Sequence, residues 1–139
     1  MGRILAIDYG KRRTGLAVTD MLRITANPLL TIDTSGLLAW LVDYTRREQV
    51  DTIVIGYPRQ MNGSESETVP AIRACEQQIR SKLPDIPVVE FDERFTSVLA
   101  HQAMITGGMK KKDRQNKMQV DKLAACIILE SYLDSLSAR

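Results

Sequence analysis

The sequence has no long apolar run, no histidine cluster and no pair of neighbouring cysteines. Its N-terminal apolar run, Ile4 to Ile7, stops at an acid and is too short for a secretory signal, and no later run approaches the ~18 residues of a membrane span. The two cysteines, Cys75 and Cys126, lie far apart among apolar neighbours, which favours buried, reduced thiols. Together these features predict a cytoplasmic protein with no membrane segment.

Acidic and basic residues nearly balance, at a net charge of +2, but the basic ones are clustered. Residues 110–122 carry a local charge of +4, so the rest of the chain is net acidic. The predicted nucleic-acid contacts in this segment are Lys110, Lys111, Lys112, Arg114 and Lys117. A second cluster is Lys11, Arg12 and Arg13. Clustered positive charge on a near-neutral body suits a polyanionic partner, although solvated loops with chance lysines would give the same pattern.

The order of apolar segments predicts an α/β fold. A length of 139 residues suits one domain over residues 1–139. Three strands in quick succession predict an antiparallel meander, and alternating helices and strands follow, so we expect a mixed five-stranded sheet flanked by helices. The predicted strands are residues 3–7, 15–19, 24–32, 51–56 and 87–91, and the predicted helices are about 37–44, 69–83, 96–105 and 117–136. Asn27-Pro28 indicates a turn or bulge in the third strand.

Asp8 stands where the first buried strand runs out. On its own it could be the first polar residue of a turn. Gly10 and Gly15 add to the pattern, because glycine permits a tight hairpin and a close approach of backbone to a ligand. This layout serves two chemistries: metal-assisted phosphodiester cleavage, or phosphate binding in sugar-kinase and actin-like ATPases.

A second acidic point, Asp92-Glu93, follows another apolar strand. By strand alternation Asp92 shares a face with Glu90, whereas Glu93 shares one with Phe91. Because Glu90 is expected to face solvent, Glu93 is the better candidate for an inner site, with Asp92 as the alternative. Arg94 could contact a phosphate or form a surface salt bridge.

The third acid, Asp121, lies on the apolar stripe of the predicted final helix. The apolar residues at helical spacing from Asp121 are Ala124, Ala125, Ile128, Leu129 and Tyr132. Glu130 falls on the opposite face of the helix. A buried carboxylate needs a partner such as a metal, and a role at the helix start is the alternative. Three such acids form the oxygen ligand set that Mg²⁺ or Mn²⁺ prefers, and the single histidine, His101, makes zinc improbable.

Four motifs in order resemble the YqgF family, also called RuvX-type Holliday junction resolvases and linked to pre-16S ribosomal RNA processing. They are residues 8–17 (DYGKRRTGLA), 56–63 (GYPRQMNG), 92–97 (DERFTS) and 121–133 (DKLAACIILESYL). The resemblance covers nearly the whole chain. It implies a ribonuclease-H-like fold, with Asp8, Glu93 and Asp121 as metal-binding catalytic acids. Family members often carry lysine where this chain has Arg12, which keeps a positive charge at that position.

The resemblance also marks the loop after the fourth strand as a substrate-side loop, with a structural turn as the alternative. Its candidate residues are Gly56, Pro58, Asn62 and Gly63. The leading hypothesis is a metal-dependent nuclease acting on structured RNA, trimming immature small-subunit ribosomal RNA at its 5′ end. A DNA-junction resolvase is the alternative within the same chemistry, and a non-catalytic RNA-binding or transcription-associated protein is the alternative of another class. An actin-like ATPase needs two such domains, and the length accommodates one.

Overall fold

The computed structural model describes residues 2–57, 69–92 and 117–137, and in the last of these ranges it describes side chains from Leu123 to Leu136. The strands are β1 (Arg3–Asp8), β2 (Arg13–Thr19), β3 (Ala26–Asp33), β4 (Val50–Tyr57) and β5 (Val88–Asp92). The helices are the short 3₁₀ turn η1 (Thr34–Gly36), α1 (Leu37–Arg47), α2 (Val69–Lys82) and α5 (Lys117–Ser137). The helix predicted over residues 96–105 lies outside the described ranges.

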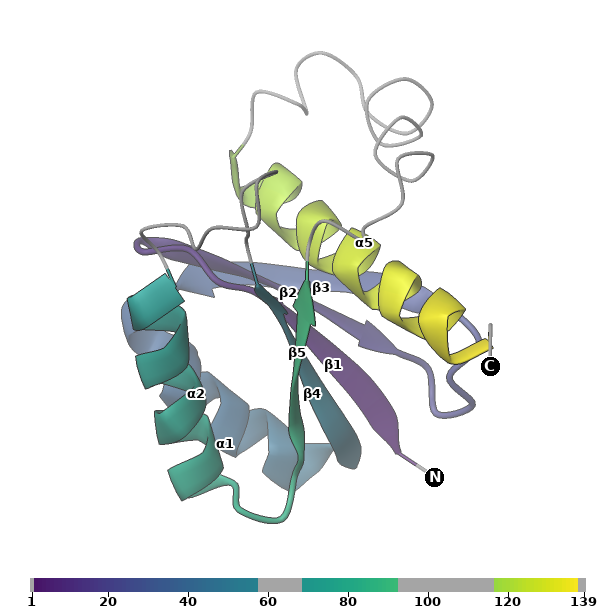
Figure 1. Ribbon diagram of the computed structural model, residues 1–139, viewed down its shortest axis with the longest axis horizontal. Helices are drawn as coiled ribbons and strands as arrows, with labels where there is room; N and C mark the ends of the chain where they lie inside the picture. The colour runs from purple at the N-terminus through teal and green to yellow at the C-terminus, as the bar shows by residue number, and fades with distance from the viewer. Residues whose placement is uncertain (1, 58–68, 93–116, 138–139) are drawn as a thin grey trace.

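The five strands form one mixed sheet in the order β3-β2-β1-β4-β5. The strands β1, β2 and β3 pair antiparallel, whereas β4 pairs parallel to both β1 and β5. This confirms the predicted meander followed by alternating elements. Because β1, β4 and β5 are parallel, their carboxyl ends meet at one edge of the sheet, beside the start of α5 (Figure 1).

The predicted irregularity at Asn27-Pro28 is a bulge in β3. The β2–β3 register shifts between Leu16, which pairs with Leu30, and Ala17, which pairs with Pro28. Proline has no N–H to donate to a ladder, so it is tolerated on an edge strand beside a bulge. The strand itself begins at Ala26, two residues later than predicted, because Ile24 and Thr25 belong to the preceding turn.

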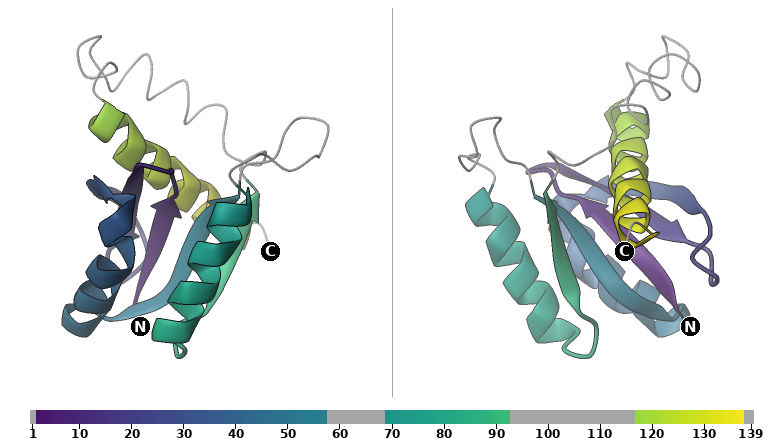
Figure 2. Two further views of the ribbon diagram at one scale, coloured as in Figure 1. Left: turned by 90° about the vertical axis from the view of Figure 1, so that its left-hand side faces the viewer. Right: turned by 45° about the vertical axis from the view of Figure 1, so that its right-hand side comes forward.

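Helices cover both faces of the sheet, α1 and α2 on one and α5 on the other (Figure 2). The face toward α1 and α2, called here the α1/α2 face, carries large side chains. The face toward α5, called the α5 face, carries a smaller cluster that includes Ile4, Ala6, Ala17 and Val54. Among the described helices, none combines the length and apolar character needed to cross a membrane.

The stripe predicted along the last helix is confirmed only in part, because Ala124 and Tyr132 are half-buried and Cys126, Ile127 and Ser131 outside it are buried as well. Ala125, Ile128 and Leu129 are buried against the sheet, and Glu130 is exposed. Both cysteines are free thiols, as predicted, but only Cys126 is buried, and Cys75 on α2 is half-buried. Burial raises the pKa of each thiol to about 11, so both stay protonated near neutral pH.

Candidate nuclease site

The candidate site is built around Asp8, the last residue of the central strand β1. Side chains alternate along a strand, and Ala6 packs on the α5 face, so Asp8 belongs to that face too. Ile7, between them, packs on the α1/α2 face. Asp8 is half-buried, which suits a carboxylate that meets a ligand at the end of a strand.

Both neighbours of Asp8 in the sheet are glycines. Gly15 on β2 is its direct cross-strand partner. On the other side the β1–β4 register pairs Ile7 with Ile55, so the next residue, Gly56, follows alongside Asp8. These two neighbouring positions therefore place no side chain directly beside Asp8 on the α5 face. The sequence pattern predicted a role for Gly15 in a tight hairpin, but the structure places it inside β2.

Thr34 stabilises the turn after Asp8 through hydrogen bonds. The Thr34 hydroxyl donates to the Gly10 carbonyl over 2.5 Å, and it lies 2.8 Å from the Thr14 hydroxyl. The Thr34 backbone N–H donates to the Arg12 carbonyl over 3.0 Å. A Cβ added to Gly10 would clash with the carbonyl oxygen of Arg13, so the tight turn requires glycine there. The glycine prediction is thus explained at this position by close backbone approach.

Two basic side chains of the cluster Lys11, Arg12 and Arg13 are exposed on this turn. Lys11 and Arg12 are exposed, and Arg13 at the start of β2 is half-buried. They therefore present positive charge within a few residues of Asp8, at the edge where the parallel strands end. Such charge attracts phosphate groups, which makes this edge suitable for a nucleic-acid backbone.

The second acidic point is described only in part. Asp92 ends β5 and is half-buried, whereas Glu93 and Arg94 lie outside the described residues. Val88 packs on the α1/α2 face, and Phe91 packs on the α5 face. By alternation Asp92 therefore belongs to the α1/α2 face, opposite to Asp8. This matters for the choice between Asp92 and Glu93 as the second acid.

Asp121 and Lys117 lie within α5, but their side chains are outside the described part of the helix. The remaining predicted site residues lie wholly outside the described residues: Pro58, Asn62, Gly63, Lys110, Lys111, Lys112 and Arg114. Among the side chains that are described, no group of three acidic, histidine or cysteine residues gathers into a metal-binding cluster. Of the three predicted acids Asp8, Glu93 and Asp121, Asp8 is thus the one whose side chain the structure describes.

Sequence inspection missed a buried carboxylate on α2. Glu76 is 2% exposed, its Oε2 lies 3.4 Å from Nη1 of Arg80, and its Oε1 accepts no hydrogen bond from the described residues. The predicted solvent-facing residue Glu90 is exposed, but its carboxyl reaches Glu76 across the gap between α2 and β5. Burial and the neighbouring Glu90 raise the pKa of Glu76 to about 7. This pair lies on the α1/α2 face and takes no part in the candidate site.

Solved structures identify the fold class. The chain is similar to Thermus thermophilus RuvC in complex with a Holliday junction substrate, at 15% identity and a TM-score of 0.59, with 97% of this chain and 96% of that chain covered. A second Thermus thermophilus RuvC structure matches at 14% identity and a TM-score of 0.55, with 96% of each chain covered. The ribonuclease-H-like fold predicted from the sequence is therefore confirmed.

The sequence profile of the family described as "RuvX: Holliday junction resolvase" matches residues 2–135, and the chain belongs to this family. Two relatives share the name "Putative pre-16S rRNA nuclease". The one from Phocaeicola vulgatus is 59% identical over 135 residues, covering 97% of each chain. The one from Bacteroides fragilis is 51% identical over 135 residues, covering 97% of this chain and 98% of its own. The family resemblance stated from the motifs is confirmed, and the protein is a nuclease, a hydrolase of phosphodiester bonds.

Proposed function

We propose that the chain, as a single domain over residues 1–139, is a divalent-metal-dependent nuclease that processes the 5′ end of pre-16S ribosomal RNA. The observation that carries the proposal is the position of Asp8, at the end of the central strand, on the α5 face and between two glycines. The name shared by the relatives at 59% and 51% identity supports the RNA substrate. Maturation of ribosomal RNA would put the protein in the cytoplasm.

We propose Glu93, and not Asp92, as the second acid. Asp92 belongs to the face opposite to Asp8, so the alternation of β5 favours the next position for a group shared with Asp8. Asp121 is proposed as the third acid. Ala125 and Ile128, four and seven residues further along α5, are buried against the α5 face, and helical spacing assigns position 121 to the same stripe.

The donor set fits a hard cation, since carboxylate oxygens are the ligands that Mg²⁺ and Mn²⁺ prefer. Asp8, Glu93 and Asp121 would hold the metal, which supplies activation of water and stabilisation of the departing oxygen. The chain's own contribution is to present Asp8 from a rigid central strand, without side chains from Gly15 or Gly56 beside it.

Substrate binding is proposed to rest on the basic residues around this edge. Lys11 and Arg12 are exposed on the turn after Asp8, and Arg13 begins the next strand. We extend the role of phosphate contact to the predicted set Arg94, Lys110, Lys111, Lys112, Arg114 and Lys117. Contacts to phosphates give affinity that falls as the salt concentration rises, and they recognise shape more than base sequence.

A second candidate substrate is a branched DNA junction, which the description of the family favours. The same acids and the same basic turn would serve either substrate, because both chemistries break a phosphodiester. The RNA and DNA candidates therefore differ in substrate and share one cleavage mechanism.

The test incubates the purified protein with a pre-16S RNA fragment and, separately, with a four-way DNA junction, in Mg²⁺, Mn²⁺ or EDTA. We expect metal-dependent cleavage of the RNA, and Asp8→Asn and Glu93→Gln should each reduce its rate by about 10³-fold, since metal-bound charge stabilisation is worth several kcal/mol. Asp92→Asn is the matched control, and it should retain cleavage within a few-fold.

Cleavage that survives EDTA or Asp8→Asn would refute the metal-carboxylate mechanism. Cleavage of the DNA junction but not of the RNA fragment would make branched DNA the substrate. RNA binding without cleavage of either substrate, unchanged in Asp8→Asn, would point to the non-catalytic alternative.

A further inference from the structure

Large apolar side chains are exposed together at the end of the molecule opposite to Asp8. Within the described residues the exposed large apolar side chains are Met21, Leu22, Ile24 and Leu136, at 40%, 68%, 70% and 37% exposure. The first three lie in the turn between β2 and β3, and Leu136 lies near the end of α5. A single exposed leucine is ordinary, but a cluster on a small protein marks a surface that contacts something.

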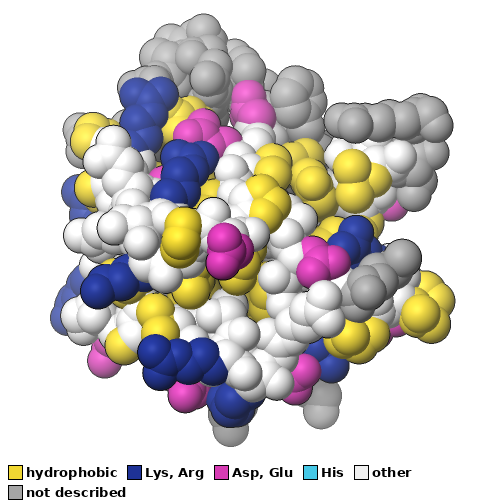
Figure 3. Space-filling view, turned by 90° about the horizontal axis from the view of Figure 1, so that it is seen from below, with side chains coloured by type: hydrophobic (Ala, Val, Ile, Leu, Met, Phe, Trp, Pro, Cys, Tyr) yellow, Lys and Arg dark blue, Asp and Glu magenta, His cyan; other side chains and the backbone are white. Residues whose placement is uncertain are grey.

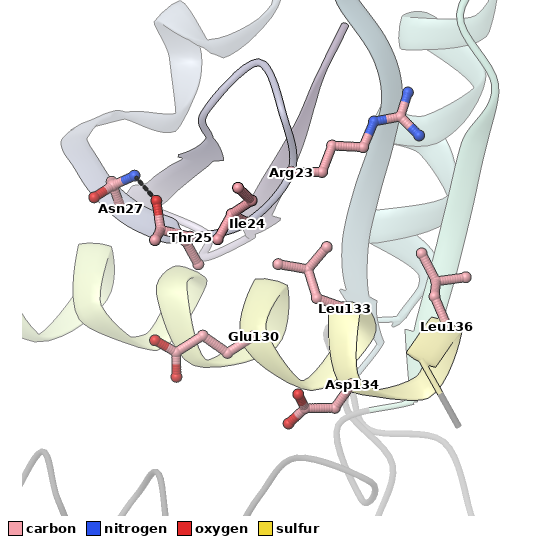
Figure 4. Close-up of a pocket in the computed structure, with 9 residues that line it drawn as sticks. Arg23, Ile24, Thr25, Asn27, Glu130, Leu133, Asp134 and Leu136 are labelled. Atoms are coloured by element: carbon pink, nitrogen blue, oxygen red, sulfur yellow. Dashed lines mark hydrogen bonds between the residues drawn. The ribbon is translucent and has the colours of Figure 1, made fainter. Parts of the chain in front are cut away.

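The turn and α5 enclose a groove, called here the apolar groove, with a volume of about 780 Å³. Its walls are Arg23 to Asn27, from the turn and the start of β3, on one side, and Glu130, Leu133, Asp134 and Leu136 on the other. In Figure 4, Leu133 and Leu136 project from α5 to one side, and Glu130 and Asp134 project to the other. Seen from below, apolar side chains stand out on the side of the molecule where α5 ends (Figure 3).

The turn that forms one wall is fixed before anything binds. Arg23 has a positive φ of 59°, an uncommon conformation for a residue with a side chain. Its side chain anchors the turn to the sheet, since Nε donates to the Gly2 carbonyl over 2.9 Å and Nη2 to the Asp51 carboxylate over 2.6 Å. These contacts offset the cost of the strained backbone.

Asp20 holds the same turn from within. Its Oδ1 accepts hydrogen bonds from the backbone N–H groups of Ile24 and Thr25, over 2.8 and 2.9 Å. The Ile24 side chain is therefore presented to solvent on a backbone held at both ends. A partner that docks on this turn need not pay for ordering it, and preorganised surfaces bind more tightly for that reason.

The charge of the apolar groove decides the kind of partner. Glu130 and Asp134 are exposed on successive turns of α5, and within the described residues neither forms an ion pair. Among the described residues of the lining, the one cation is Arg23, and its charge is neutralised by Asp51. Free carboxylates at the rim repel phosphates and attract lysine or arginine. The groove thus disfavours nucleic acid and favours a basic, apolar protein segment.

We propose that the apolar groove docks a basic amphipathic helical segment of a partner protein. Apolar side chains of that segment pack on Ile24 and Leu136, and its lysine or arginine side chains pair with Glu130 and Asp134. Amphipathic helices bind apolar grooves in this manner, through anchors at helical spacing. Because the groove lies at the amino end of β1 and Asp8 lies at its carboxyl end, the partner and the nucleic acid can be bound together.

The test uses a synthetic helical peptide of leucine and lysine in an amphipathic pattern, labelled with a fluorophore and titrated with the full chain. A matched peptide has glutamate in place of each lysine. We expect the leucine-lysine peptide to bind at least about ten-fold more tightly than its matched partner. Ile24→Ser should weaken that binding by about ten-fold, the effect of losing one well-buried apolar anchor. Asp134→Lys should weaken it by about three- to ten-fold.

Two variants serve as matched controls. Leu22→Ser changes a residue of the same turn with nearly the same exposure, but outside the groove lining, and Asp85→Lys reverses an exposed acid between α2 and β5. Both should leave binding unchanged. Equal binding of the two peptides, or binding unaffected by Ile24→Ser, would overturn the proposal.

Two further outcomes would also overturn it in favour of another occupant. Sedimentation of the chain alone tests for self-association. If the chain self-associates and Ile24→Ser abolishes this, the occupant of the apolar groove is a second copy of the chain. Loss of RNA binding in Ile24→Ser would instead make the surface a nucleic-acid contact. The proposal predicts a sedimentation pattern and an RNA affinity that Ile24→Ser leaves unchanged.

Discussion

The two faces of the sheet are packed with side chains of different size. On the α1/α2 face the buried strand residues are large, among them Leu5, Ile7, Leu16, Ile53 and Ile55. On the α5 face the middle of β1 and β2 carries Ala6 and Ala17. At the site end of that face stand Gly15 and Gly56, beside Asp8. Two helices cover the first face, and of the described helices it is α5 that packs across β1, β2 and β3 on the second.

The difference in side-chain size suggests different roles for the two faces, with the α1/α2 face contributing mainly to stability and the α5 face to the proposed site. The larger of the two buried apolar clusters lies between the sheet and the helices α1 and α2, and burial of apolar surface is the main source of folding free energy. Small side chains let α5 approach the backbone of β1 and β2 closely. That approach brings the start of α5, with Asp121 in its sequence, to the end of the sheet where Asp8 stands. The α1/α2 face carries the larger apolar cluster, and the α5 face carries Asp8, the proposed first metal-binding acid.

The largest expected effect is on stability, from a truncation in the α1/α2 face. Ile55→Ala removes a fully buried side chain from β4 and should lower the free energy of unfolding by about 2–5 kcal/mol. Nuclease activity per folded molecule should be unchanged. Chemical denaturation measures the loss. Val54→Ala, the next residue on the α5 face, is the matched variant and should cost less, because it removes a smaller side chain. Equal losses would erase the contrast between the faces.

An enlargement in the α5 face should affect both properties. Ala17→Leu adds volume beneath α5 at a fully buried position, which should cost about 1–3 kcal/mol and displace the helix from the sheet. We therefore expect slower RNA cleavage even at temperatures where the variant is fully folded. Val18→Ile adds a methylene to the opposite face and is the control. If Ala17→Leu cleaved RNA at the normal rate, close approach of α5 would not matter for the site.

The buried Glu76 gives the α1/α2 face a pH dependence. Its pKa is raised from 4.5 to about 7 by burial and by Glu90, so the folded state binds a proton more tightly than the unfolded chain. The stability that this proton confers is complete below about pH 4.5 and is lost as pH rises through about 7.

Glu76→Gln should therefore be more stable than the unsubstituted chain above neutral pH, by about 1–3 kcal/mol, and should flatten the dependence between pH 4.5 and 7. Thermal unfolding across that range measures both. Asp85→Asn, at an exposed acid, controls for loss of one negative charge. A pH profile identical in Glu76→Gln would show that this carboxyl does not titrate with folding.

The smallest effect is expected from the hydroxyl of Thr34, which supports the turn after Asp8. Thr34→Val removes the hydroxyl that bonds to Gly10 and Thr14, at a cost of about 1 kcal/mol. Because those bonds fix the turn after Asp8, RNA cleavage should slow by a few-fold. Thr34→Ser keeps the hydroxyl and should restore most of the rate. A Thr34→Val variant as fast as the unsubstituted chain would show that the turn needs no support from the α1/α2 side.

Local patterns in the sequence predicted most of the fold. The meander and the alternation that follows are confirmed, because each depends on residues close together in the chain, and the stripe on α5 is confirmed in part. The bulge at Pro28 was also predicted, since proline restricts a strand at the position where it stands. The predicted site residues Asp8, Glu93 and Asp121 remain predictions.

Features that depend on strand register could not be predicted. Nothing local says that Gly15 stands directly opposite Asp8, or that Gly56 follows on its other side. The pairing of Glu76 with Glu90 likewise joins a helix and a strand through their packing, and Glu90 by itself reads as an ordinary surface acid. The anchoring of Arg23 by Asp51 joins residues 28 positions apart.

The position of α5 has a consequence for the order in which the protein is made. The helix follows every strand in the chain, and it covers one face of β1, β2 and β3. A nascent chain that has emerged only through β5 therefore exposes Ala6, Ala17 and Val54 to the exit environment, and it lacks Asp121. If Asp8 and Asp121 share one site, as proposed, we expect the nuclease to remain inactive until α5 has emerged and packed on the sheet.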